Sequence, residues 1–259
     1  MENKNDRAAW LQGGNAHCSI VPQPKDHPWR FILLGAPGVG KGTQASLLCD
    51  YFKTCHLSTG DIFRAAKSHP ECEHSAAMVV ALDCMTRGEL VSDETVIRLV
   101  AERPQCLHCR GGFILDGFPR TVAQAKQFEK ILAAQNIKLD AVLDYSLPLK
   151  QIIARLSGRR TCPNCKAVFH IESLPPKSEG VCDNCGGVLY QREDDRPESI
   201  RVRMAAYSKN ATPLKRFYQR RKLLVTVKAA GTPDETFSRT LDALKNHSAP
   251  EKEAELQCA

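Results

Sequence analysis

The sequence "GAPGVGKGTQ" at residues 35–44 decides the fold. Its four glycines let the backbone turn several N–H groups toward a phosphate chain, and Lys41 brings a positive charge to the outer phosphates. An aliphatic run from Arg30 precedes this stretch, and apolar residues recur at helical spacing from Ala45 onward. The glycines therefore join a strand to the start of a helix, which predicts a phosphate-binding loop.

Short aliphatic and β-branched runs alternate with helical patterns along most of the chain. This alternation is typical of parallel strands that are covered by helices on both faces. The sequence therefore predicts an α/β fold with a five-stranded parallel sheet flanked by helices. The five predicted strands are "RFILLG" from Arg30, "HLS" from His56, "GFILD" from Gly112, "AVLDYSL" from Ala141 and "LLVTV" from Leu223.

Residues 158–195 interrupt this alternation with a stretch that is rich in Cys, Pro and Gly and lacks a long apolar stripe. We expect them to form a small subdomain inserted into a main domain at residues 29–245. Residues 1–28 and 246–259 are polar or have little periodicity. We expect these two segments to be loosely ordered extensions.

Four cysteines of the insertion have the spacing of a metal site. Cys162 and Cys165 are followed after sixteen residues by Cys182 and Cys185. Each CxxC turn can aim two thiolates at one ion, and four protein ligands leave no open position for chemistry. We expect a structural zinc ion that takes the place of a hydrophobic core. The same spacing also suits iron.

Composition and charge narrow the classes of function. No apolar run approaches the roughly 18 residues of a membrane span, and no apolar signal-peptide core begins the chain. We therefore expect a cytoplasmic protein without a membrane partner. Residues 150–222 hold sixteen Lys or Arg against seven Asp or Glu, a net charge of +9. This charge indicates an anionic partner, such as nucleotide phosphate, nucleic acid or lipid.

The loop reads "GKGT", with Gly42 where Ser or Thr usually follows the lysine, and in this it resembles adenylate kinases and other nucleoside monophosphate kinases. The resemblance extends over roughly residues 30–245. It implies a P-loop kinase that transfers a phosphoryl group reversibly from ATP to AMP, giving two ADP, with magnesium and as a monomer. The motifs that carry it are "LSTGDIFRAA" from Leu57, "GELVSDETVI" from Gly88, "GFILDGFPRTVAQA" from Gly112, "RLSGRRTCPNC" from Arg155, "YQREDDRPESIRVR" from Tyr190 and "TPLKRFY" from Thr212.

The resemblance also implies two inserted parts and two sets of binding residues. The parts are an AMP-binding flap at residues 58–91 and a zinc-binding lid at residues 158–195. The AMP-binding residues that it implies are Thr59, Arg64, Val91, Gly117, Arg120, Gln124, Arg192 and Arg203. The ATP-binding residues that it implies are Gly38, Val39, Gly40, Lys41, Gly42, Thr43, Arg155, Arg159, His170 and Gly231.

Catalysis by such an enzyme needs positioning and positive charge more than a base. A phosphate monoester has a second pKa near ~6, so the acceptor oxygen is already largely anionic at neutral pH. By the resemblance, Asp61 and Asp116 hold magnesium-bound water, whereas Thr43 lies one residue late for the usual magnesium ligand. The expected catalytic residues are Lys41, Asp116, Arg120, Arg155, Arg159, Arg192 and Arg203.

Two stretches depart from the family pattern. Cys106 and Cys109 form a second CxxC pair, but no partner pair follows at metal spacing, so we expect ordinary thiols there. The stretch "KSHPECEHSAAM" from Lys67 lacks the glycine expected in the flap. For His170, a surface histidine without a ligand is nearly as good an interpretation as an ATP-binding one.

Three alternatives to an AMP kinase stay open. A nucleic-acid-binding protein would explain the charge around the four cysteines, but we expect no nucleic-acid partner, because Phe169 is the one aromatic residue between Cys162 and Cys185 that could stack on a base. A slow nucleotide-hydrolysing switch would explain the phosphate loop but not Arg64, Arg120 and Gln124, which need a second nucleotide. A kinase that uses GTP or another monophosphate would have the same fold and mechanism.

Overall fold

The computed structural model describes residues 7–13, 16–18, 22–23, 27–68, 74–86, 91–165, 167–192 and 195–256. Its helices are α1 (Ala8–Gln12), α2 (Lys41–Phe52), α3 (Thr59–Ser68), α4 (Ala76–Thr86), α5 (Asp93–Ala101), α6 (Pro104–Leu107), α7 (Val122–Ala134), α8 (Leu149–Ser157), α9 (Pro197–Gln219) and α10 (Pro233–Leu256). Its strands are β1 (Arg30–Gly35), β2 (Cys55–Ser58), β3 (Phe113–Asp116), β4 (Ala141–Ser146), β5 (Arg159–Thr161), β6 (Val168–His170) and β7 (Leu224–Lys228).

The five predicted strands form one parallel sheet in the order β2-β3-β1-β4-β7. Strand β1 lies at its centre and pairs in parallel with β3 on one side and β4 on the other. Strand β2 pairs with β3, and β7 pairs with β4, again in parallel. The predicted α/β fold with a five-stranded parallel sheet is therefore confirmed.

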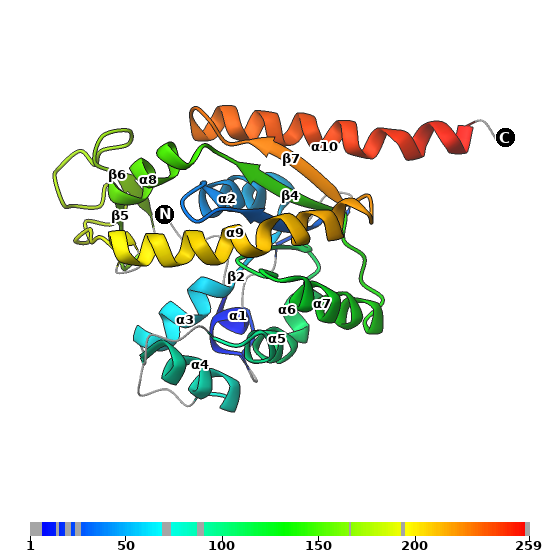
Figure 1. Ribbon diagram of the computed structural model, residues 1–259, viewed down its shortest axis with the longest axis horizontal. Helices are drawn as coiled ribbons and strands as arrows, with labels where there is room; N and C mark the ends of the chain where they lie inside the picture. Colours follow the sequence, from blue (N-terminus) through cyan, green and yellow to red (C-terminus); the bar gives the residue numbers. More distant parts are fainter. Residues whose placement is uncertain are drawn as a thin grey trace.

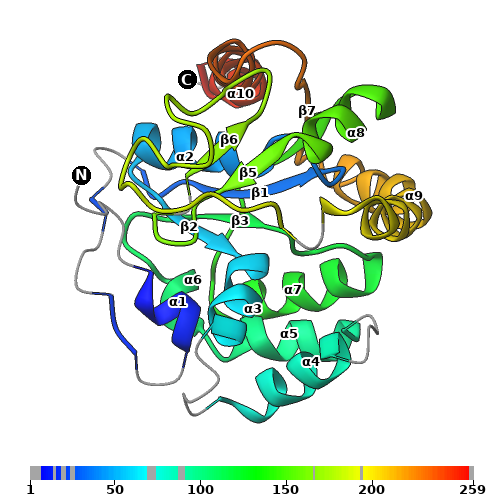
Figure 2. The same cartoon turned by 90° about the vertical axis from the view of Figure 1, so that its left-hand side faces the viewer.

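Alternate residues of the central strand enter separate hydrophobic cores on the two faces of the sheet. Phe31 and Leu33 pack with α2 and with Leu244 of α10. Ile32 and Leu34 pack with residues of α3 to α7 and of α9 on the other face. Figures 1 and 2 show these two helical layers with the sheet between them. Because both faces are covered, the central strands β1 and β3 are almost entirely apolar, whereas the edge strand β7 alternates buried and exposed residues.

The carboxyl ends of the strands place the predicted site residues at one edge of the sheet. Strand β1 leads into the phosphate loop, β2 leads into α3 at Thr59, and β3 ends at Asp116. Ligands of open α/β sheets bind beside this edge, because the loops that follow the strands meet there. The edge is therefore the place where the predicted residues can act together.

Residues 158–195 contain a second, two-stranded antiparallel sheet made of β5 and β6. Figure 1 shows it at the left-hand end of the molecule, beside α8. Its own buried cluster consists of Cys162, Phe169, Cys182 and Leu189. So small a cluster contributes little to the stability of this subdomain. A metal held by the four cysteines would supply further stability.

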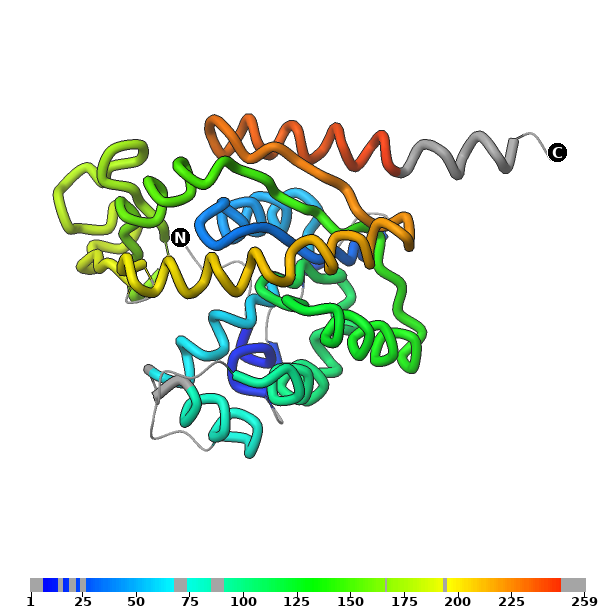
Figure 3. The backbone as a smooth tube through the Cα atoms, in the orientation of Figure 1, coloured from blue at the N-terminus to red at the C-terminus, as the bar shows by residue number. Residues whose placement is uncertain are grey.

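The N-terminal segment differs from the loosely ordered extension that we expected. Helix α1 packs beside α3, as Figure 3 shows, and buries Trp10 completely. The Trp10 Nε1–H donates to the carbonyl oxygen of Ser58, 2.9 Å away. The buried Arg103 donates through Nε to the carbonyl oxygen of Trp10 at 2.6 Å. The buried indole N–H and the backbone carbonyl of Trp10 both have partners, which explains why residues 8–12 are ordered.

In the C-terminal segment, α10 continues beyond residue 246 to Leu256. Its earlier turns cover the sheet through Leu244, as described above. Among the residues that the structure describes, no helix combines the length and the apolar character needed to cross a membrane.

Candidate active site

The phosphate loop is closed around its own lysine. Lys41 is the first residue of α2, and its Nζ donates to the carbonyl oxygens of Gly35 at 2.8 Å and Ala36 at 3.0 Å. The predicted residues Val39 and Gly40 precede it in the loop, and Gly40 has a left-handed φ of 105°. An incoming phosphate can take these lysine N–H groups from the two carbonyls without unfolding the loop.

One glycine of the loop is required by a close approach. A Cβ atom at Gly38 would lie 2.5 Å from the Leu156 side chain of α8, and the φ of Gly38 is +79°. A larger residue there would both clash and strain the backbone. The predicted residues Gly42 and Thr43 are exposed in the first turn of α2.

Charges from distant parts of the chain converge on Lys41. Burial lowers the pKa of Lys41 to about 8. The carboxylate of Asp116, at the end of β3, opposes this shift. The positive charges of three predicted arginines, Arg120, Arg203 and Arg159, add to it. Four of the predicted catalytic residues therefore lie close enough to Lys41 for their charges to act on it, as a site for a phosphate chain requires.

Asp116 lies between the phosphate loop and strand β2. Its Oδ2 is 3.7 Å from Nε2 of His56, and its carbonyl oxygen accepts a hydrogen bond from the Thr59 hydroxyl at 3.4 Å. Burial raises the pKa of the Asp116 carboxyl, but His56 and Lys41 outweigh it, so the pKa lies below its usual value. Asp116 is thus an anion that can hold a cation or its water shell.

Arg120 lies in the turn after β3 and Gln124 lies in the first turn of α7, and their bonds order this segment. The Arg120 Nε donates to the carbonyl oxygen of Gly117 at 2.8 Å, and its backbone N–H donates to Oε1 of Gln124 at 2.7 Å. The Nε2 of Gln124 donates to Oδ1 of Asp93 at 2.7 Å. A Cβ atom at Gly117 would lie 2.7 Å from the Thr59 hydroxyl, so a side chain at this position would fill the space beside Thr59.

Arg64 is the predicted AMP-binding residue on α3, and it pairs with Asp61 one turn earlier. The Arg64 Nη2 lies 2.5 Å from Asp61 Oδ1, and the Nη1 of Arg7 lies 2.8 Å from Asp61 Oδ2. Burial raises the pKa of Asp61, but the two guanidinium groups outweigh it and hold the pKa well below its usual value. The pair with Arg7 ties the N-terminal segment to the site.

Asp195 orients two of the predicted arginines. Its fully buried carboxylate accepts bonds from Arg159, from Nε at 2.7 Å and from Nη2 at 2.5 Å. The Nη1 of Arg203 lies 3.8 Å from the same carboxylate. The Nε of Arg192 donates to the Thr161 hydroxyl at 3.0 Å. Bidentate pairing fixes the plane of a guanidinium, so Arg159 is held in one orientation.

Arg155 bridges the phosphate loop and the loop after β7. Its Nη1 donates to the carbonyl oxygen of Val39, and its Nη2 donates to the carbonyl oxygen of Gly231, both at 3.2 Å. His170 lies on β6, where Nε2 is 3.1 Å from the Ala154 carbonyl oxygen. Its Nδ1 accepts from the backbone N–H groups of residues 172 and 173, so both ring nitrogens have partners within the protein.

The four predicted metal ligands lie together. All four sulfur atoms are within 4.8 Å of one another. The Sγ atoms of Cys162 and Cys185 are 3.4 Å apart, and so are those of Cys165 and Cys182. Four thiolates around one zinc ion, with Zn–S bonds of about 2.3 Å, would be separated by about 3.8 Å. The observed cluster is therefore close to the arrangement that a tetrahedral ion requires.

The remaining predicted residues have less defined positions in the site. Val91 is half-buried against the core below the sheet, next to Ser92, which caps α5. The stretch from Lys67 that lacks the expected glycine includes residues 69–73, which lie outside the described residues. Cys106 and Cys109 join no described group of three metal-ligating side chains.

Three contacts of the predicted site residues were not predicted from the sequence. They are the contact of His56 with Asp116, the hydrogen bond of Gln124 to Asp93, and the ion pair of Arg7 with Asp61. The first two could have been suspected from "CHLSTGD" and "SDETVI", where each residue stands near a predicted site residue. Arg7 gave no such signal, because its partner is 54 positions away.

Comparisons with known proteins point to one family. A family model described as "Adenylate kinase" matches residues 33–223. A protein described as "Adenylate kinase" from Streptomyces coelicolor is 44% identical over 217 residues, which cover 83% of this chain and 98% of that protein. Proteins with the same description from Caldicellulosiruptor saccharolyticus and Geotalea daltonii are 46% and 42% identical, over 83% of this chain and 98% and 99% of their own lengths.

Proposed function

The chain belongs to the adenylate kinase family and transfers a phosphoryl group between ATP and AMP, and we propose that its polar residues divide into an ATP side and an AMP side that meet at Lys41. The observation that carries this proposal is the convergence of Asp116 and three arginines on the Lys41 ammonium. All of these groups come from one chain, which supports an enzyme that works as a monomer.

The ATP side consists of the phosphate loop, Lys41 and Arg155. Loop N–H groups and the N-terminus of α2 bind the phosphates, and Lys41 leaves the carbonyls of Gly35 and Ala36 to reach the outer ones. Arg155 already spans the loop and Gly231, so it can contact a nucleotide lying between them. His170 is proposed beside the ATP base through its ring face, since both of its nitrogens are occupied.

The AMP side consists of residues around the ends of β2 and β3. Arg64 and Arg120 bind the AMP phosphate, and in doing so Arg64 exchanges its bond to Asp61 for one to the ligand. Thr59, Val91, Gly117 and Gln124 surround the base and sugar. The hydrogen bond from Gln124 to Asp93 fixes the orientation of the Gln124 side-chain amide. Its remaining donor and acceptor positions therefore also have fixed directions.

Transfer follows from position and charge. An anionic oxygen of the AMP phosphate attacks the terminal phosphorus of ATP in line, and ADP leaves with the electrons of the broken P–O bond. Arg159, Arg192 and Arg203 surround the transferring group together with Lys41, and they neutralise the charge on its oxygens. No residue needs to remove a proton, because the attacking oxygen carries none.

Magnesium fits the carboxylates of this site. Asp116 is ionised, since its pKa lies below the usual value, and hard carboxylate oxygens are the donors that magnesium prefers. We propose that Asp116 and Asp61 hold the water shell of the ion that accompanies ATP. When bound, magnesium supplies further positive charge to the phosphates.

The acceptor specificity tests the proposed AMP side. We expect the purified chain, with ATP and magnesium, to form ADP from AMP at least about 100-fold faster per active site than from GMP, CMP or UMP, because lost base contacts leave buried polar groups unpaired. The measurement is ADP formation with each acceptor and without any. Equal turnover of AMP and another monophosphate would show that Thr59 and Gln124 do not select adenine.

The four-cysteine cluster is proposed to bind structural zinc, because soft thiolates select zinc and the cluster replaces a core. We expect Cys182→Ser to abolish stoichiometric zinc and to lower the midpoint of thermal unfolding by about 5–10 °C, which corresponds to roughly 2–3 kcal/mol in a chain of this size. ATP affinity of the phosphate loop should persist. The measurements are metal content by mass spectrometry, calorimetry and ATP binding.

Cys84→Ser is the matched control for this variant, because Cys84 lies on α4, outside residues 158–195. It should keep the metal content and the melting midpoint of the parent protein. Full zinc content in Cys182→Ser, or iron in place of zinc in the parent protein, would contradict the proposed site.

A further inference from the structure

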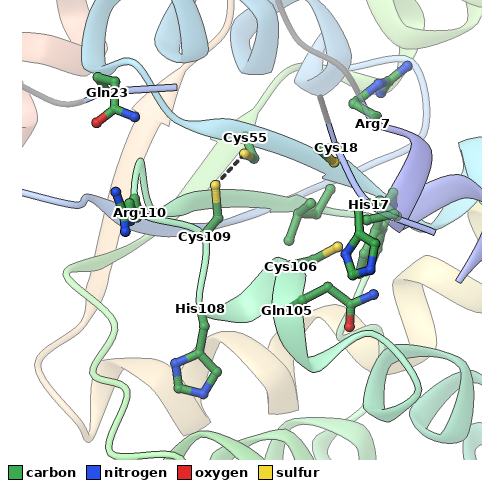
Figure 4. A pocket seen from close by; sticks show the side chains of 13 residues that line it. Arg7, His17, Cys18, Gln23, Cys55, Gln105, Cys106, His108, Cys109 and Arg110 are labelled. Atoms are coloured by element: carbon green, nitrogen blue, oxygen red, sulfur yellow. Dashed lines mark hydrogen bonds between the residues drawn. The ribbon is translucent and has the colours of Figure 1, made fainter. Parts of the chain in front are cut away.

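A cavity lies away from the proposed nucleotide sites, under the N-terminal segment. It has a volume of about 380 Å³, and its walls come from described residues between positions 7 and 23, from strand β2 and from residues 105–110. No residue that we assign to ATP, AMP or zinc lines it. Four thiols do, as Figure 4 shows: Cys18, Cys55, Cys106 and Cys109.

Two of these thiols are in direct contact. The Sγ atoms of Cys55 and Cys109 are 2.7 Å apart and point toward each other (Figure 4). A disulfide needs a separation of about 2.05 Å, so a small movement of two side chains suffices to form the bond. Cys55 begins β2, and Cys109 lies in the loop before β3, so two separate segments meet here.

The two sulfurs have different chemical characters. A hydrogen bond from the Cys55 thiol lowers the pKa of Cys109 to about 7, whereas the same bond and burial raise the pKa of Cys55. Cys109 is the less buried of the two, and Cys55 is 9% exposed. The arrangement is that of a nucleophile facing a cavity with a resolving thiol behind it.

The remaining cavity wall favours an anion. Two arginines line it, Arg110 and Arg7, of which Arg7 also pairs with Asp61, and none of the lining residues that the structure describes is acidic. The volume is in the range of small-molecule binding sites. A reagent that carries carboxylates would therefore be attracted to the cavity, and one that carries ammonium groups would be disfavoured.

We propose that Cys109 and Cys55 form a redox-active dithiol that reacts with an anionic low-molecular-weight disulfide. The Cys109 thiolate attacks one sulfur of the reagent, forms a mixed disulfide and releases one thiol of the reagent. The Cys55 sulfur then loses its proton and attacks Cys109, which forms the Cys55–Cys109 disulfide and releases the second thiol. The two protein thiols are oxidised, and the reagent disulfide is reduced to two thiols.

The new bond would connect the start of β2 to the segment that leads into β3. These two strands pair in parallel, with Cys55 opposite Phe113, and they lead to Thr59 and Asp116 at their carboxyl ends. The dithiol therefore lies at the amino ends of these two strands, whereas the proposed AMP side lies at their carboxyl ends.

The test treats the full-length, zinc-loaded protein with glutathione disulfide and maps thiols by differential alkylation and peptide mass spectrometry. We expect a Cys55–Cys109 disulfide as the first product, while Cys106 in the same cavity stays reduced. Cys55→Ser should stop at a glutathione adduct on Cys109, and Cys109→Ser should leave Cys55 unmodified. Cystamine, a cationic disulfide, should react at least about tenfold more slowly, because like charges repel it from the cavity.

Several outcomes would overturn the proposal. One is that both thiols stay free while Cys84, outside the cavity, is modified. Another is an adduct on Cys55 in Cys109→Ser at the parental rate. A third is that cystamine reacts as fast as glutathione disulfide, which would show that the cavity does not favour an anionic reagent. Cys106→Ser controls for a general effect of removing a cavity thiol and should leave disulfide formation at the parental rate.

Discussion

Lys41→Met is expected to lower kcat/KM for ATP by about two to three orders of magnitude, because the variant removes the positive charge at the end of the phosphate loop. The lysine Nζ donates to the carbonyl oxygens of Gly35 and Ala36, and we propose that in the complex these bonds pass to the phosphates. Methionine has a similar length and volume, so the loop should keep its fold. Steady-state ADP formation at varied ATP measures the loss.

Lys126→Met is the matched control, because Lys126 is exposed on α7. It should keep parental kinetics within about twofold, since surface substitutions of this kind have small effects. If Lys41→Met retained parental kcat/KM with an unchanged melting midpoint, the ammonium would have no role at the phosphates.

The pH profile provides a second measurement of the same charge. Burial and three arginines hold the pKa of Lys41 at about 8 in the free protein, so the ammonium loses its proton as pH rises through that value. kcat/KM, which reports the free enzyme, should therefore fall above about pH 8. Bound phosphates raise the lysine pKa, so kcat should fall only at higher pH. A flat kcat/KM profile up to pH 10 would contradict this assignment.

Local sequence patterns predicted the sheet because each strand is marked within a few residues. The run before Gly35 and the run that ends at Asp116 are apolar throughout, as buried parallel strands must be. The glycines and Lys41 specify their own loop, since the strand, the turn and the start of α2 are contiguous. The four cysteines were predictable for the same reason, because each ligand pair is local.

The N-terminal helix was not predictable in this way. Its order depends on Trp10 bonding to Ser58 and on Arg103 bonding to Trp10, partners 48 and 93 positions away. Five residues of helix carry almost no periodicity, and so short a helix is not stable alone. Burial of the Trp10 indole in the tertiary structure determines whether this helix forms, and no local sequence pattern predicts that burial.

The same limit applies to the supporting contacts of the site. The sequence predicted Gln124 through a motif, but the carboxylate that orients it, Asp93, lies 31 positions earlier. Arg159 was predicted, but its bidentate partner Asp195 lies 36 positions later, next to a second aspartate, Asp194, in the sequence. The structure resolves the contact of Asp195, whereas residue 194 lies outside the described part of the chain. Geometry, and not residue type, distinguishes such partners.

Arg120→Ala is expected to lower kcat/KM for AMP by about two orders of magnitude or more, with little change in KM for ATP. The guanidinium lies in the turn after β3, near enough to Lys41 to act on its pKa, and it is proposed to contact the AMP phosphate in both the ground state and the transition state. Arg120 is exposed, so its removal should leave the melting midpoint unchanged. ADP formation at varied AMP and saturating ATP measures the effect.

Two further variants separate charge from geometry. Arg120→Lys keeps the charge but loses the two-pronged contact with phosphate, so we expect a loss between those of the parent protein and Arg120→Ala. Arg98→Ala removes an exposed arginine of α5 that pairs only weakly with Glu94, at 3.4 Å, and should behave as the parent. If Arg120→Ala raised KM for ATP and AMP equally, the arginine would serve both nucleotides, and the proposed division between an ATP side and an AMP side would be wrong at this residue.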